Sequence, residues 1–215
     1  MAQLTETLAR RALDRAVGDR HAEFVGEMQR IVEATYGLIE RTGQVDPPLR
    51  DILREAGLST QGFYRYFRSK DELLLLLLDD GRRRLLGYLE HRMQRAADPE
   101  ARLRAWIEGV LAQASRPDAA ARTRPFVANQ DRLSDAFPEE QQASVDLLIG
   151  QVGGVIEQLP SRPKTSRAET RRDALAVYHL VFGALHDHLT RRSQPTAGEI
   201  DHLVRFIASA TSGRA

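Results

Sequence analysis

Residues 59–70 combine side chains that can hydrogen-bond to base edges with side chains that can bind phosphate; they read Ser-Thr-Gln-Gly-Phe-Tyr-Arg-Tyr-Phe-Arg-Ser-Lys. The segment begins with small and polar residues, so its N-terminal end can approach a polar partner closely. Tyr64 and Tyr66 then supply hydroxyls that can donate to phosphate oxygens. From Phe63 to Lys70 every charge is positive, although the whole chain has a net charge of only +1. This local pattern is typical of a nucleic-acid contact, which the overall charge does not indicate.

Each of these residues also has an ordinary structural interpretation. Tyr64 and Tyr66 could be half-buried rings that support a turn, and Arg65 and Arg68 could belong to a solvated helix face. The functional interpretation therefore depends on the elements that hold the segment.

A helix-turn-helix arrangement surrounds the segment. An amphipathic helix is expected over residues 21–42. Asp46, which precedes two prolines, is expected to be the N-cap of a second helix that ends at Gly57. Ser59 can cap a third, short helix that extends to about Tyr66. Two short helices joined by a glycine-containing turn form the plan in which the second helix enters the major groove of DNA.

A long helix follows directly. Ser69 and Glu72 have the spacing of a capping box, and the helix that they open is expected from Lys70 to about Ala96. Lys70 stands in the first turn, where the backbone N–H groups and the positive end of the helix dipole favour a phosphate. A domain boundary is expected inside this helix, near residues 79–81, where a leucine run gives way to charge.

Residues 51–73 resemble the DNA-binding signature of the tetracycline-repressor (TetR) family; they read Asp-Ile-Leu-Arg-Glu-Ala-Gly-Leu-Ser-Thr-Gln-Gly-Phe-Tyr-Arg-Tyr-Phe-Arg-Ser-Lys-Asp-Glu-Leu. The resemblance covers about residues 21–78 and is most specific over residues 64–70. It implies an all-helical homodimer with an N-terminal three-helix helix-turn-helix domain and a C-terminal helical domain for ligand binding and dimerisation. It also implies repression of transcription at a palindromic operator, relieved by a small ligand.

The resemblance further implies roles for individual residues. By matching position, the residues directed toward bases would be Thr60, Gln61, Gly62 and Arg65, and those directed toward phosphates would be Tyr64, Tyr66 and Lys70. Two positions depart from the family pattern, because Gln61 stands where a small residue is frequent and Gly62 where Ser or Thr is frequent.

Helix signals continue through the rest of the chain and strand signals are nearly absent, so an all-α fold is expected. Helices are predicted to start at Asp98, at Ser166 and at Thr196, the last two with capping boxes. A single helix from Pro117 is expected to end near Phe137. The expected organisation is an N-terminal extension over residues 1–20, a DNA-binding domain over 21–78 and a ligand-binding and dimerisation domain over 79–215.

The last two long helices are the expected dimer interface. The helix from about Ala168 to Thr190 is apolar over a wide arc, so it must bury against more than one neighbour. One neighbour is expected to be the final helix, and the other the same two helices of a second copy. Such a homodimer has the two-fold symmetry that a palindromic operator requires.

A site for an unknown small-molecule effector is expected in the same half of the chain. An apolar cavity with a few polar anchors is the usual composition of such a site. The candidate residues are Trp106, Phe126, Asn129, Gln130 and Tyr178. Each of them could equally be ordinary core, and the sequence indicates no more than an apolar or acyl-type ligand.

Composition argues against several other classes. The chain has no cysteine, which removes disulfides, thiolate zinc sites and thiol nucleophiles. His179, His186 and His188 lack the spacing of metal ligands on one helix face, and no phosphate-binding loop or nucleophile motif is present, so no metal, cofactor or enzymatic activity is expected. The longest leucine run, over residues 73–78, is too short to span a membrane, and a cytoplasmic protein is expected.

Two alternatives stay open at this point. One is a TetR-like DNA-binding dimer that has no small-molecule effector. The other is a helical bundle that does not bind DNA and uses its histidines to bind metal or to catalyse a reaction.

Overall fold

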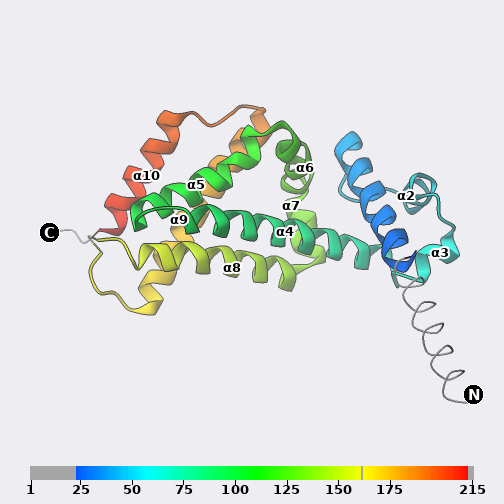
Figure 1. Ribbon diagram of the computed structural model, residues 1–215, viewed down its shortest axis with the longest axis horizontal. Helices are drawn as coiled ribbons and strands as arrows, with labels where there is room; N and C mark the ends of the chain where they lie inside the picture. Colours follow the sequence, from blue (N-terminus) through cyan, green and yellow to red (C-terminus); the bar gives the residue numbers. More distant parts are fainter. Residues whose placement is uncertain (1–22, 161, 213–215) are drawn as a thin grey trace, which may run out of the picture. The chain divides into compact units, whose positions relative to one another are not determined.

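The computed structural model describes residues 23–160 and 162–212, and within them the chain is helical and contains no strand (Figure 1). A helix over residues 23–42 is followed by α2 (Leu49–Ala56), α3 (Thr60–Tyr64), α4 (Lys70–Gln94), α5 (Pro99–Ser115), α6 (Pro117–Ala128), α7 (Gln130–Ala136), α8 (Pro138–Ile156), α9 (Arg167–Arg191) and α10 (Ala197–Thr211). The predicted all-α fold is confirmed. The extension predicted over residues 1–20 lies outside the described residues.

Contacts between Cα atoms divide the chain into two compact units that meet at Leu74 and Leu75, within α4. The N-terminal unit contains the helix over residues 23–42, α2, α3 and the first residues of α4. Its core consists of apolar side chains from all of these elements, among them Ile31, Leu38, Ile39, Ile52, Phe63, Phe67 and Leu73. The assignment of DNA binding to the N-terminal unit and of ligand binding to the C-terminal unit stays a prediction.

Gly57 and Ser59 fix the turn between α2 and α3. Gly57 has a φ of 67°, a left-handed conformation that glycine adopts without a Cβ penalty, and its N–H donates to the carbonyl of Leu53. The Ser59 hydroxyl oxygen accepts a hydrogen bond from the N–H of Gly62 at 3.0 Å, which caps α3. Both predicted signals are confirmed, and α3 ends at Tyr64, earlier than expected.

The predicted N-cap at Asp46 is wrong. Helix α2 begins at Leu49, and Pro48 occupies the N-cap position without a side-chain hydrogen bond. Because a residue that precedes a proline disfavours the helical conformation, Pro48 keeps Pro47 out of the helix and delays the helix start. The Asp46 carboxylate is instead paired with the ammonium group of Lys70, with Nζ and Oδ1 2.5 Å apart.

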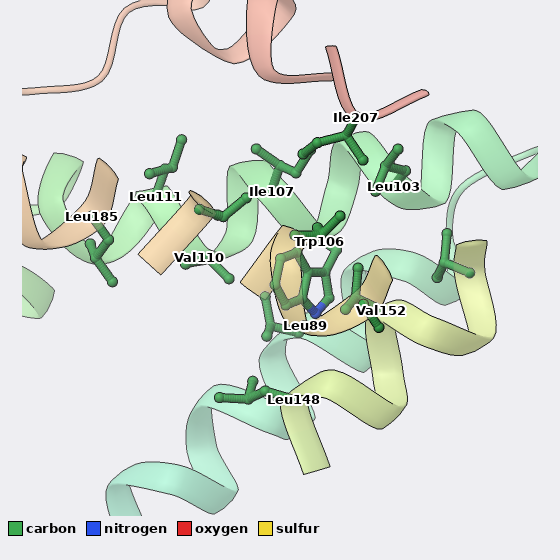
Figure 2. Close-up of a cluster of buried hydrophobic side chains, with 14 of the residues drawn as sticks. Leu89, Leu103, Trp106, Ile107, Val110, Leu111, Leu148, Val152, Leu185 and Ile207 are labelled. Carbon is green, nitrogen blue, oxygen red and sulfur yellow. The ribbon is translucent and has the colours of Figure 1, made fainter. Parts of the chain in front are cut away.

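Helix α5 is central to the C-terminal unit, where it contacts α6, α8, α9 and α10. Figure 2 shows the fully buried ring of Trp106 among apolar side chains that come from α4, α5, α8, α9 and α10. Gly109 allows α5 to lie close to α4, because a Cβ atom at this position would be only 2.6 Å from Cδ2 of Leu89. These contacts make a densely packed core at the centre of the unit.

Side-chain caps define the starts of α5, α9 and α10. Asp98 caps α5, and both capping boxes, Ser166 with Glu169 at α9 and Thr196 with Glu199 at α10, are present as predicted. Hydrogen bonds from the backbone and hydroxyl groups of the cap residues lower the pKa of both glutamates. The caps therefore stabilise these helices most when the glutamates are ionised.

The single helix predicted from Pro117 to near Phe137 is wrong. The chain leaves the helical conformation at Asn129, and α6 and α7 are separate. The Asn129 side-chain amide donates to the carbonyl of Pro125 at 2.8 Å, while its backbone N–H bonds to the carbonyl of Phe126. The asparagine side chain thus takes the carbonyl that a continuing helix would have bonded through its backbone.

Among the described residues, none of the helices combines the length and the apolar composition that crossing a membrane requires.

Candidate nucleic-acid interface

Helix α3 presents a polar face to solvent and an apolar face to the N-terminal core. The side chains of Thr60, Gln61, Tyr64 and Arg65 are exposed. Phe63 is fully buried, and its ring centroid lies 5.3 Å from that of Phe67. This aromatic pair fixes the orientation of a helix that is too short to be stable without tertiary contacts.

Gly62 serves the turn rather than the exposed face. The residue is buried, its N–H donates to the Ser59 hydroxyl, and a Cβ atom here would be 3.4 Å from that oxygen. The exposed side chains in this part of α3 are those of Gln61, before the glycine, and Tyr64, two residues after it.

Tyr66 points toward the helix over residues 23–42. Its hydroxyl donates to Oε2 of Glu27, and its ring centroid lies 4.6 Å from that of Phe24. The hydrogen bond to the Glu27 carboxylate raises the pKa of Tyr66, and burial and the carboxylate charge act in the same direction. The half-buried ring considered above as the structural alternative is thus the arrangement seen for Tyr66, whereas Tyr64 is 56 % exposed.

Two further expected contact residues, besides Tyr66, are held by carboxylates. Arg65 places Nη2 3.1 Å from Oε2 of Glu27, and its guanidinium lies 5.6 Å from the centre of the Tyr66 ring. Lys70, at the start of α4, is paired with Asp46. Glu27 and Asp46 are functional candidates that the sequence did not indicate, because no local spacing connects them with residues 65–70.

The structure brings two of the five expected effector residues into one aromatic group. Trp106 is fully buried, and its ring centroid lies 6.4 Å from that of Phe182. Tyr178 stacks on Phe182, and the centroids of the two rings are 4.4 Å apart. Burial raises the pKa of the Tyr178 hydroxyl. Phe182 was not among the candidates, although it lies one helical turn from Tyr178.

The other three expected effector residues lie on α6 and α7. Phe126 is half-buried, Gln130 is exposed, and the amide of Asn129 is used in ending α6. Within the described residues, no hydrogen bond or ring pair joins these three residues to Trp106, Tyr178 or Phe182.

Two open hollows lie on the surface of the C-terminal unit. The larger, about 480 Å³, lies between α5, α9 and α10; its lining residues are Leu111, Ala184, His188, Thr196, Gly198, Glu199, His202 and Leu203. The smaller, about 190 Å³, lies between α9 and α10; its lining residues are Asp173, Ala176, Val177, Leu180, Phe206, Ile207, Ala210 and Thr211. None of the five expected effector residues lines either hollow.

Comparisons with known proteins agree with the helix-turn-helix geometry. Residues 31–77 match the family model of bacterial regulatory proteins of the tetR family. A TetR transcription regulator from Haloarcula marismortui ATCC 43049 has a similar fold, with 20% identity, a TM-score of 0.67 and coverage of 87% of this chain and 98% of that chain. A transcriptional regulator from Rhodococcus sp. Rha1 (18% identity, 86% and 95% coverage, TM-score 0.67) and the reduced form of NemR from E. coli (18%, 88% and 100%, 0.67) are also similar in fold.

Proposed function

Because residues 31–77 match the family model of bacterial regulatory proteins of the tetR family, we propose that the chain binds a palindromic operator as a homodimer and represses transcription until a small apolar ligand releases it. The family match and the helix-turn-helix geometry support a transcriptional regulator with a DNA-binding domain. Operator symmetry, repression and the ligand belong to the proposal.

The polar face of α3 carries the proposal. Buried Phe63 orients the helix so that Thr60, Gln61 and Arg65 are exposed. In a helix-turn-helix protein the second short helix lies in the major groove, where amide and guanidinium groups form paired hydrogen bonds with base edges. We assign base contacts to these three residues and phosphate contacts to Tyr64 and Lys70.

The homodimer is supported by an apolar surface on α9 and α10. Phe206 is 55 % exposed, and Leu175 and Leu180 are also exposed although they are large and apolar. Two of these residues, Leu180 and Phe206, border the hollow between the two helices. A second copy that placed its own α9 and α10 here would cover this surface in an isologous interface, the arrangement of most homodimers.

The effector site rests on the Trp106 group. The indole Nε1 of Trp106 is buried and has no hydrogen-bond partner among the described residues. A buried donor without a partner is unusual in a folded protein, so an acceptor group of a ligand would satisfy it. The alternative, a DNA-binding dimer without an effector, is favoured by the dense packing around Trp106 and by the position of both hollows elsewhere.

Selection of bound duplexes from a random DNA pool tests the DNA-binding part of the proposal. We expect a consensus of two inverted half-sites whose centres are about one DNA turn (roughly 34–36 Å) or a multiple of it apart. Recovery of a single asymmetric half-site would contradict the homodimer, and a lack of enrichment would contradict sequence-specific binding.

The ligand part is tested by calorimetric titration of a candidate effector with and without operator. Coupling between two sites is reciprocal, so a ligand that weakens operator binding roughly 5- to 150-fold must bind operator-bound protein more weakly by the same factor. Equal ligand affinity in both titrations would favour the dimer without an effector switch.

A further inference from the structure

Two carboxylates of the N-terminal unit hold cationic and hydroxyl groups at the end of α3 and the start of α4. Glu27 Oε2 accepts hydrogen bonds from the hydroxyl of Tyr66 and from Nη2 of Arg65. Asp46 is paired with Nζ of Lys70. These three partners belong to the segment that the proposed function directs toward DNA.

The contacts of Glu27 compete with contacts to DNA. A tyrosine hydroxyl has one proton to donate, so Tyr66 cannot donate to a phosphate while it donates to Glu27. The hydrogen bond to the Glu27 carboxylate raises the pKa of Tyr66, so the tyrosine keeps its hydroxyl proton in this contact. The Glu27 side chain is only 13 % exposed, whereas that of Arg65 is 62 % exposed, so the carboxylate lies beneath the guanidinium. A second arginine, Arg30, lies 3.8 Å from the other carboxylate oxygen.

The charges of Glu27 and Asp46 reduce the positive charge that DNA meets. Binding to DNA of any sequence is driven mainly by cations that neutralise phosphates and release condensed counterions. An arginine or lysine that already neutralises a carboxylate releases fewer counterions when it approaches a phosphate. The cost of this neutralisation is the same for every DNA sequence.

We propose that Glu27 and Asp46 act as internal substitutes for DNA phosphate, which occupy Arg65, Tyr66 and Lys70 in the free protein and thereby weaken binding to non-specific DNA. This inference rests on the proposed function. Because this cost is the same for every DNA sequence, the two carboxylates lower the affinity for operator and for non-specific DNA by the same factor.

The experiment compares the salt dependence of binding to a non-specific duplex for the full chain and for the variants Glu27→Gln and Asp46→Asn. Each variant removes one negative charge with little change of shape. We expect tighter non-specific binding and a plot of log K against log salt that is steeper by about 0.9 per protomer, the contribution of one additional neutralised phosphate.

Glu55→Gln is the matched control. Glu55 lies in the same unit and is also paired with an arginine, since Nη1 of Arg41 is 2.7 Å from Oε1, but it belongs to α2 and contacts none of the three held residues. This variant makes the same change in net charge, and we expect its salt dependence to equal that of the unmodified chain.

A second substitution separates charge release from structural damage. Adding Arg65→Gln to Glu27→Gln should return the slope to that of the unmodified chain, because it removes the cation that Glu27 had held. A variant that was merely damaged would bind more weakly with a shallower slope, and its thermal unfolding midpoint would fall.

The outcomes distinguish this inference from the proposed function. If the unmodified chain and the Glu55→Gln control bind no DNA, the proposed function is wrong. If they bind but both Glu27→Gln and Asp46→Asn have unchanged or shallower slopes, Glu27 and Asp46 are not substitutes for phosphate, while DNA binding stands. The ion pair of Asp46 with Lys70 shares no residue with the contacts that Glu27 makes to Arg65 and Tyr66. The Asp46→Asn measurement therefore tests the inference by itself if Glu27→Gln does not fold.

Discussion

A charge placed at Phe206 should dissociate the proposed dimer without unfolding the subunit. Phe206 belongs to α10, and 55 % of the residue is exposed in the single chain. A substitution there removes few contacts within the protomer, so Phe206→Glu should leave the fold intact. In the dimer, however, each substituted residue would bury a carboxylate without a partner.

The size of the effect follows from the exposed area. A phenylalanine side chain can bury roughly 200 Å², so the 55 % that is exposed leaves roughly 110 Å² for a partner to cover. At about 25 cal/mol per Å² this area is worth about 2.7 kcal/mol per protomer, or about 5 kcal/mol for the symmetric pair. Since about 1.4 kcal/mol corresponds to a factor of ten, the dissociation constant should rise roughly 10³- to 10⁴-fold before the cost of the buried charge is added.

Sedimentation equilibrium over a range of protein concentrations, together with circular dichroism, measures this effect. Leu147→Glu is the matched control, because Leu147 is 53 % exposed but belongs to α8. We expect a folded monomer for Phe206→Glu and an unchanged dimer for Leu147→Glu. A stable dimer of Phe206→Glu with the unfolding midpoint of the original chain would refute the assignment of the interface to α9 and α10. Phe182→Glu would be a poor test, because Phe182 contacts Trp106 and Tyr178 within the protomer.

Three further measurements test the site and the fold. Gln61→Ala should change the discrimination between operator and altered operator by about 1–3 kcal/mol while non-specific binding stays constant, and an unchanged consensus in a binding selection would remove Gln61 from base recognition. Gly109→Ala should lower the free energy of unfolding by about 1–3 kcal/mol in denaturant titration because its Cβ would collide with Leu89, whereas Gly87→Ala, at an open position, should be neutral or stabilising. Glu199→Ala should lower the thermal midpoint at neutral pH; the pKa of Glu199 is depressed in the folded state by the Thr196 cap, so the stabilisation exists above the ordinary glutamate pKa and the difference between the proteins should disappear as the pH falls below about 4.3. A difference that stayed constant as the pH fell from neutral through the ordinary and the lowered pKa of Glu199 would contradict the capping role of the ionised carboxylate.

The features that the sequence predicted are those determined by neighbouring residues. The left-handed turn at Gly57 and the cap at Ser59 depend on backbone preferences and on hydrogen bonds over three residues, so their spacing is sufficient to predict them. The capping box of Thr196 with Glu199 was predicted for the same reason.

The features that the sequence missed depend on residues far apart in the chain. Glu27 and Tyr66 are separated by 39 positions, and no periodicity connects them. Asp46 was interpreted as a cap because local rules favour an acidic residue before prolines, but the ion pair with Lys70, formed in the folded unit, determines where its carboxylate lies. The division of the predicted long helix at Asn129 was missed because an asparagine side chain can either face solvent or replace a backbone hydrogen bond, and composition does not distinguish the two.

The five residues of α3 have a consequence for transferring its specificity to another protein. A helix of this length does not form alone in water, and here its conformation depends on Phe63 in the core and on the turn at Gly57. A peptide that copies residues 59–70 should therefore be unstructured and should not carry the recognition with it. The smallest portable part is a whole helix-turn-helix scaffold, into which the exposed residues of α3 are grafted individually while the aromatic anchors and the glycine turn of the recipient are retained.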